Sequence, residues 1–158
     1  MQSYSFFSYF IISLIVYLGS AAGLYLVKIA PKEVENNKKI FLIILSAFFV
    51  ITLGLFSFEG SGALIIIPIV MALTGAIIAL SGRLYKDLYF VFLALPYSLS
   101  YVYSGQFLYV AMCIFGFAMI SASLNYTRTH NFKRILIRRL PFIVLVLFGY
   151  LLTLSIIA

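Results

Sequence analysis

Long stretches without a charged residue constrain this chain more than any other feature of its sequence. Residues 1–27 carry no charge, and neither do residues 40–58 or 140–158. A helix needs about 20 mostly apolar residues to cross the hydrocarbon core of a bilayer. Only 9% of the 158 residues are charged and 65% are hydrophobic, whereas a soluble domain carries about 25% charged residues. We therefore expect an integral membrane protein and exclude both a soluble globular and a disordered chain.

The apolar stretches predict an all-α fold, a polytopic membrane protein in which six transmembrane helices form one compact bundle with short loops. Runs such as residues 40–45 are apolar on every side, so they favour helices over the alternating strands of a membrane barrel. The first helix is expected to end before Pro31, and the sixth to begin at Leu140-Pro141, because proline suits the first turn of a helix. The predicted spans of this single domain (residues 1–158) are residues 6–30, 40–58, 63–81, 88–103, 107–124 and 140–158.

The basic residues predict how the six spans are oriented. All 11 Lys and Arg residues lie in or beside the loops that join spans one and two, three and four, and five and six. Lys and Arg concentrate in cytoplasmic loops. Both termini are therefore expected outside the cell membrane, and these three loops in the cytoplasm. No basic residue precedes the first span, which argues against a cleaved signal peptide.

Small residues gather in the cytoplasmic halves of the odd-numbered spans and predict close helix packing. Small residues four positions apart let helix backbones approach closely in lipid. Close helix packing alone explains the pattern. A helical hairpin repeated three times along the chain is an alternative explanation. Two inverted halves of three spans are a further alternative, although their helix breaks match only loosely. The candidate packing residues are Gly19, Gly23, Gly75, Ala79 and Gly116.

One polar helix face and one carboxylate are the candidates for a ligand site. Tyr97 and Tyr101 are four residues apart and share a face of the fourth span, with Ser100 beside them. Pro96 removes a backbone hydrogen bond from the same helix and frees a carbonyl about one turn earlier. Glu59 is predicted to lie alone on the outer face, where a carboxylate suits cation or proton entry. The alternatives are interfacial tyrosines, serines that serve helix packing, and a solvated carboxylate in a turn.

The segment before the sixth span is predicted to lie along the cytoplasmic membrane surface. Clusters of basic residues beside a span attract anionic lipid headgroups, and residues 135–137 add apolar surface for an amphipathic segment. Because these charges lie against a bilayer, lipid is a simpler partner than nucleic acid; an acidic partner protein is the alternative. The candidate headgroup contacts are Arg128, Lys133, Arg134, Arg138 and Arg139.

The inventory of reactive side chains argues against an enzyme. The chain has one His, one Cys and no Trp, and so it lacks the ligand sets of common zinc and haem sites. Glu33, Glu35 and Asp87 are expected to be solvated at loop positions or helix starts, which leaves no charge buried within a span. We therefore expect no catalytic, metal or cofactor site.

Two functions are compatible with this inventory. The sequence favours a non-catalytic accessory or structural subunit that packs with membrane-protein partners or with copies of itself. The alternative is a small oligomeric transporter or channel for a solute or a cation. A polar cavity that reaches Tyr97, Ser100 or Tyr101 is expected of a transporter, and a dry bundle is expected of a subunit.

Overall fold

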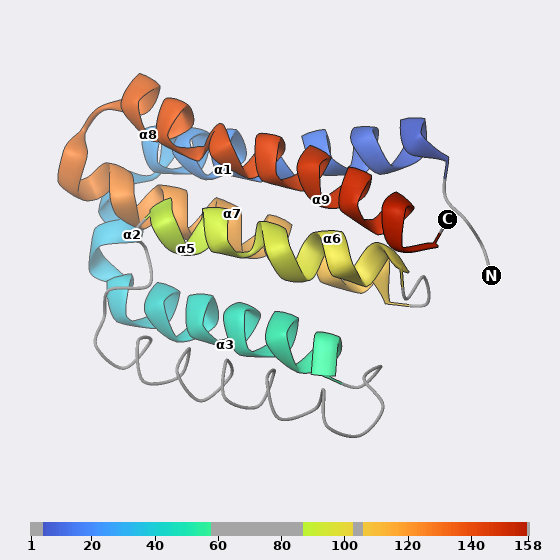
Figure 1. Ribbon diagram of the computed structural model, residues 1–158. Helices are drawn as coiled ribbons and strands as arrows, with labels where there is room; N and C mark the ends of the chain where they lie inside the picture. The colour runs from blue at the N-terminus through green and yellow to red at the C-terminus, as the bar shows by residue number, and fades with distance from the viewer. Residues whose placement is uncertain (1–4, 58–86, 103–105, 158) are drawn as a thin grey trace.

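Every element in the described part of the chain is a helix, as predicted (Figure 1). The computed structural model describes residues 5–57, 87–102 and 106–157. No strand occurs among these residues, which confirms the all-α class for them. The helices are α1 (Phe6–Ile29), α2 (Pro31–Asn36), α3 (Lys38–Ser57), α5 (Asp87–Phe92), α6 (Ala94–Val102), α7 (Phe107–Thr129), α8 (Phe132–Arg139) and α9 (Pro141–Ile157).

Four helical stretches among the described residues are long and apolar enough to cross a membrane. They fall on predicted spans one, two, five and six. The predicted fourth span is a shorter apolar helix, Asp87–Ser98, and predicted span three, residues 63–81, lies outside the described residues. The count of six spans therefore stays a prediction. The four long stretches are Phe6–Ile29, Lys38–Leu55, Phe107–Thr129 and Phe132–Leu152.

The helices run in two directions along one elongated bundle (Figure 1). α1 and α7 run from the end where α9 finishes toward the end that carries α2 and α8, and α3, α5, α6 and α9 run back. α7 is central, because it contacts the most helices in the described part of the chain: α1, α2, α3, α5, α6 and α8. α1 packs mainly against α7, and α6 mainly against α9. The main partner of the first span is thus the fifth span, not its neighbour in sequence.

The predicted fourth span is interrupted at Leu93, between α5 and α6. Pro96 explains the interruption: it has no N–H for the carbonyl of Phe92, and its ring crowds that carbonyl. The N–H groups of Leu93 and Tyr97 still donate to the carbonyls of Tyr89 and Leu93, each at 3.2 Å. The helical path therefore continues through the interruption, as the position of the proline predicts.

The segment 125–139, which joins predicted spans five and six, is mostly helical. α7 continues to Thr129, His130 turns the chain with a positive φ of 50°, and Asn131 caps α8 by accepting a hydrogen bond from the N–H of Arg134 at 2.9 Å. α8 then packs against α1, α5 and α7 and leads into α9 at Pro141. One face of α8 thus packs against the bundle, while Lys133, Arg134 and Arg138 stay exposed; its place along a membrane surface stays a prediction.

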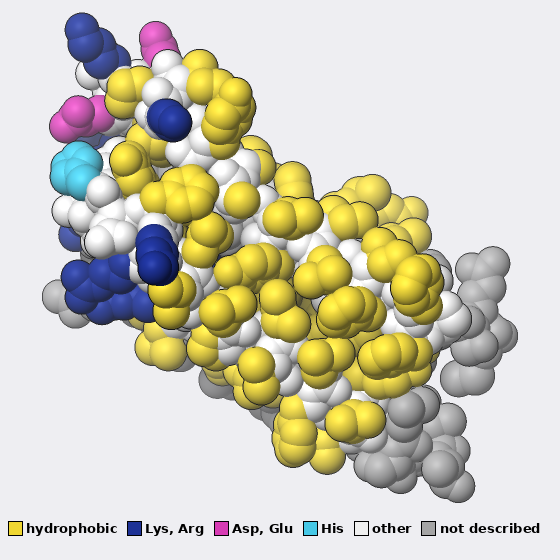
Figure 2. All heavy atoms as spheres, turned by 90° about the horizontal axis from the view of Figure 1, so that it is seen from above, with side chains coloured by type: hydrophobic (Ala, Val, Ile, Leu, Met, Phe, Trp, Pro, Cys, Tyr) yellow, Lys and Arg dark blue, Asp and Glu magenta, His cyan; other side chains and the backbone are white. Residues whose placement is uncertain are grey.

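Aromatic side chains fill much of the core. Tyr9 lies over Phe107 with ring centroids 5.6 Å apart, and Phe90 stacks on Phe142 at 4.4 Å. Large apolar side chains also cover most of the outer surface in view, whereas basic side chains gather at one end (Figure 2). This end is formed by the end of α1, by α2, the start of α3, the end of α7 and by α8 (Figure 1).

Candidate functional site

The predicted ligand face of the fourth span points into the bundle. Tyr97 is fully buried, and its hydroxyl lies 3.0 Å from Ser13 Oγ of α1. The Ser100 hydroxyl donates to the carbonyl of Tyr97 at 2.7 Å. Tyr101 is partly buried, and its ring meets the ring of Tyr9 edge-on at 4.8 Å. Glu59, the other ligand candidate, lies outside the described residues.

Tyr9 of α1 connects this face of α6 to α9 as well. It was not among the residues predicted from the sequence. Its hydroxyl donates to the carbonyl of Val146 in α9 at 3.1 Å, and it lies 3.4 Å from Ser98 Oγ. The Ser98 hydroxyl in turn donates to the carbonyl of Ala94 at 2.8 Å. A sequence signal exists, because Tyr9 and Ser13 are four residues apart in an apolar helix. Such a pair shares one face and suits hydrogen bonds between helices.

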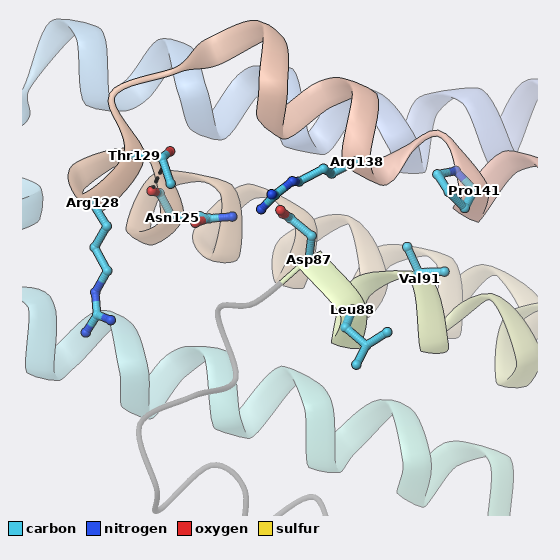
Figure 3. Close-up of a pocket in the computed structure, with 8 residues that line it drawn as sticks. All are labelled: Asp87, Leu88, Val91, Asn125, Arg128, Thr129, Arg138 and Pro141. Carbon is cyan, nitrogen blue, oxygen red and sulfur yellow. Dashed lines mark hydrogen bonds between the residues drawn. The ribbon is translucent and has the colours of Figure 1, made fainter.

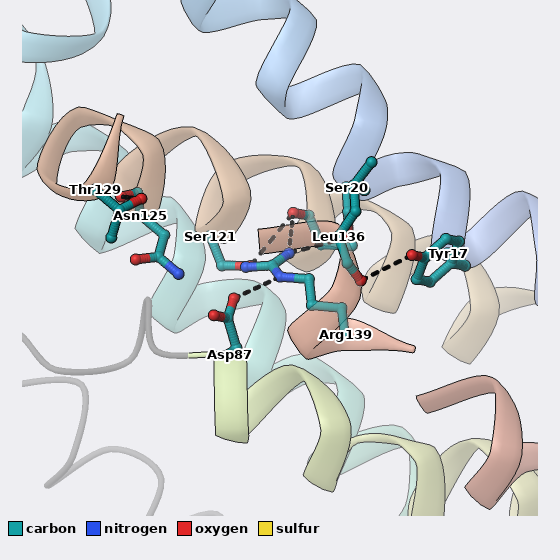
Figure 4. Close-up of polar contacts among 9 residues, drawn as sticks. Tyr17, Ser20, Asp87, Ser121, Asn125, Thr129, Leu136 and Arg139 are labelled. Carbon is teal, nitrogen blue, oxygen red and sulfur yellow. Dashed lines mark hydrogen bonds and ion pairs between the residues drawn. The ribbon is translucent and has the colours of Figure 1, made fainter. Parts of the chain in front are cut away.

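A buried arginine lies in the other half of the bundle, toward the basic end. The side chain of Arg139 is 0% exposed, and its Nε donates to Asp87 Oδ1 at 2.7 Å. Its two Nη atoms donate to Ser20 Oγ at 3.0 Å, Ala118 O at 2.9 Å and Ser121 Oγ at 3.1 Å (Figure 4). The guanidinium also lies 5.1 Å from the centroid of the Phe90 ring. This buried network joins α1, α5, α7 and α8.

The network corrects two expectations from the sequence. Arg139 is not available to lipid headgroups, because burial directs its guanidinium to acceptors inside the bundle. Asp87, expected to be solvated, has a side chain that is only 11% exposed and pairs with Arg139. A buried charge is tolerated only when it is paired and hydrogen-bonded. The absence of a buried charge, which the sequence analysis assumed, is therefore wrong.

The position of the network explains why it was missed. Ser20 lies nine residues before the end of α1, a distance of about 13 Å at 1.5 Å per residue. Residues of α8 reach this depth because the helix begins at Phe132 and returns along the bundle. Ile135 and Arg139 are four residues apart and form the buried face of α8. The same spacing was visible in the sequence, although it was assigned to a surface segment.

The junction between α8 and α9 has its own polar contact. Pro141 has no N–H, and the N–H of Leu140 donates to Ile137 O at 3.2 Å instead of Leu136 O. The carbonyl of Leu136 is therefore released from the regular helical pattern. The hydroxyl of Tyr17 in α1 donates to it at 2.9 Å (Figure 4), so that the carbonyl keeps a hydrogen-bond partner.

The four other headgroup candidates, Arg128, Lys133, Arg134 and Arg138, are exposed at the basic end. Two hollows lie among them. The larger is an open crevice of about 710 Å³ between α5, α7 and the junction of α8 with α9 (Figure 3). Its lining residues are Asp87, Leu88, Val91, Asn125, Arg128, Thr129, Arg138 and Pro141. The smaller hollow, of about 400 Å³, is lined by Asn131, Lys133, Arg134, Ile137 and Arg138.

The structure places three of the five packing candidates at close helix contacts. A Cβ built on Gly23 would overlap the carbonyl oxygen of Met119 in α7, and one on Gly19 would lie 2.8 Å from the carbonyl oxygen of Phe115. A Cβ on Gly116 would lie 2.6 Å from the ring of Phe48 in α3. The candidates Gly75 and Ala79 lie outside the described residues.

Comparison with known proteins finds no family model, no curated relative and no solved structure that matches this chain. Within the described ranges, no group of three or more His, Cys, Asp or Glu side chains is placed to hold a metal ion.

Proposed function

We propose that this chain is a six-span protein of the cell membrane, with both termini outside and its basic end in the cytoplasm. The four long apolar helices support membrane insertion. Basic side chains gather at one end of the bundle (Figure 2), and in the described residues they come from α1, α2, α3, α7 and α8, which agrees with the excess of Lys and Arg in cytoplasmic loops. Anionic lipids of the inner leaflet are its proposed lipid partners, and nucleic acid is not a proposed partner.

Within this class we propose a non-catalytic accessory subunit that packs with membrane-protein partners or with copies of itself. The main supporting observation is that the hydroxyls of the predicted fourth span form hydrogen bonds inside the bundle. Tyr97 bonds to Ser13, Ser98 to a carbonyl of its own helix, and Ser100 to the carbonyl of Tyr97. The bond between Tyr97 and Ser13 joins two helices and stabilises their packing, and the two serines are satisfied by their own helix, whereas a solute path needs polar groups that face an open space.

Isolation from the native membrane tests the subunit proposal. The tagged full chain is extracted in a mild detergent, and the intact mass of the assembly is measured by native mass spectrometry. We expect a defined assembly heavier than the 17.8 kDa chain, with a second membrane protein or further copies in fixed ratio. A monomer in every mild detergent tested, together with ion flux through vesicles that contain it, would contradict the proposal.

A second candidate, a small transporter, is favoured by the Asp87–Arg139 pair. Ionisable residues inside membrane spans are expensive and commonly mark ion or proton pathways, and Asp87 also lines the open crevice. Vesicles with a trapped pH dye distinguish the two functions. A transporter is expected to carry protons or alkali cations and to lose this flux in Asp87→Asn. A subunit is expected to give the same signal as empty vesicles.

A further inference from the structure

The open crevice at the basic end combines three features. Its rim carries cationic side chains, its wall is apolar, and its floor contains a carboxylate that another residue already neutralises. Figure 3 shows Arg138 of α8 and Asp87 of α5 pointing toward one another, with the amide of Asn125 turned to the same space. Leu88 and Val91 of α5 line the side of the crevice below them.

The charge balance of the crevice favours an anion. Asp87 is paired with the buried Arg139 at 2.7 Å, so its negative charge is compensated from within the bundle. A further arginine, Arg138, is exposed and lines the same crevice. Arginine donates in a fixed fork that matches phosphate oxygens. The Asn125 amide is a further donor that faces the same space.

The apolar wall favours an amphipathic anion over a free one. Leu88 is 72% exposed, and Pro141 at the start of α9 is exposed as well. Leu88 lies in the first turn of α5 and Pro141 is the first residue of α9, so both stand where segments proposed to cross the bilayer begin. A volume of about 710 Å³ falls within the range of small-molecule sites.

We propose that this crevice binds one anionic phospholipid, with the phosphate at Arg138 and Asn125 and an acyl chain along Leu88, Val91 and Pro141. The inference rests on the membrane insertion proposed above. It goes beyond a general attraction of basic residues to the membrane surface, because it assigns one lipid to one site. Basic pockets between spans on the cytoplasmic side are known to hold phosphorylated headgroups.

The test compares two arginines of the same helix. Arg138 lines the crevice, whereas Arg134, one turn earlier in α8 and also exposed, is not among the residues that line it. The full chain, Arg138→Gln and Arg134→Gln are purified in mild detergent and titrated with phosphatidylglycerol, phosphatidylcholine or inorganic phosphate. Bound molecules are counted by native mass spectrometry. We expect one tightly bound phosphatidylglycerol, about tenfold weaker binding in Arg138→Gln, and less than about twofold weakening in Arg134→Gln.

A second variant examines the apolar wall without a change in charge. Leu88→Gln is expected to weaken phosphatidylglycerol binding several-fold, and the exposure of Leu88 makes it tolerant of the change. Equal weakening by Arg138→Gln and Arg134→Gln would overturn the site in favour of diffuse attraction. Equally tight phosphatidylcholine, or displacement of the lipid by inorganic phosphate, would also overturn it. A chain that stays soluble without detergent would instead contradict membrane insertion itself, so the two failures are distinguishable.

Discussion

At the residue scale, the pair of Arg139 and Asp87 is asymmetric, and the asymmetry decides what each substitution does. Arg139 is 0% exposed, whereas the Asp87 side chain is 11% exposed and opens onto the crevice. Removal of the carboxylate leaves a charged guanidinium without a countercharge in the interior. Removal of the guanidinium leaves a carboxylate that reaches water. The two losses are therefore expected to differ, although the ion pair is the same.

We predict that Asp87→Ala destabilises the fold more than Arg139→Met. Loss of one partner of a buried pair costs about 3–5 kcal/mol, and we expect Asp87→Ala to reach this range. Arg139→Met keeps much of the side-chain volume. Ser121 loses the arginine as a donor but keeps a hydrogen bond, because its hydroxyl also donates to Ala118 O at 3.3 Å within its own helix. The double variant, Asp87→Ala with Arg139→Met, is expected to recover most of the stability that Asp87→Ala loses. Thermal unfolding in detergent measures the stability of all three variants. Unfolding is followed with a fluorogenic maleimide that reacts when Cys113, which is partly buried, becomes exposed.

Arg138→Met is the matched control, because Arg138 is the neighbouring residue and is exposed. Its effect on stability is expected to be small. If Arg139→Met were as harmful as Asp87→Ala, or if the double variant gave the sum of both losses, the pair would not be coupled as the structure indicates.

At the element scale, the central contact is the parallel packing of α1 against α7. Gly23 lies against Met119, and the hydroxyl of Ser123 donates to the carbonyl of Gly23 at 2.8 Å as well as to Met119 O at 2.9 Å. Backbones that approach this closely leave no room for a side chain. In lipid, helix association depends on such packing, because burial of apolar surface gives little driving force there.

We predict that Gly23→Ala lowers stability and that Gly54→Ala does not. The new Cβ at position 23 would overlap the backbone of Met119, whereas one at position 54 of α3 meets nothing within 4 Å. Overpacking costs about 1–3 kcal/mol, while alanine gains about 0.5–1 kcal/mol over glycine within a helix. Thermal unfolding in detergent measures both variants. Equal effects at the two positions would show that the α1–α7 contact is looser than described.

The helices were predictable wherever apolar length alone decided them. Spans one, two and five begin within two residues of the predicted positions, and the interruption at Leu93 follows from Pro96. In residues 125–139 the prediction of an amphipathic segment placed all five basic residues at the surface, which is wrong for Arg139. Asn131 caps a helix there, and the spacing of Ile135 and Arg139 places one charge inward. The average composition of a helix does not show that a single charged residue in it is buried.

At the scale of the whole molecule, the candidate site was predictable in its parts but not in its assembly. Tyr97, Ser100 and Tyr101 share a helix, and their spacing identified the face. No local pattern indicates that Tyr9 and Ser13 of α1 complete it, or that Asp87 meets Arg139 across 52 positions of sequence. These pairings depend on the order in which helices surround α7. That order is a tertiary property, because many arrangements of apolar helices satisfy the same hydropathy.

The last prediction concerns the membrane topology and uses three single cysteines in a Cys113→Ala background. Ser5 precedes α1 at one end of the bundle, and Asn36 ends α2 at the other; both are exposed. An impermeant maleimide is expected to label Ser5→Cys from outside and Asn36→Cys only after the membrane is opened. Met112 of α7 is 68% exposed in the bundle, yet Met112→Cys is expected to resist labelling from both sides. Maleimide needs a hydrated thiolate, and lipid would surround this position.

Labelling of Ser5→Cys and Asn36→Cys from the same side would contradict the topology, and rapid labelling of Met112→Cys would show that water covers the apolar surface.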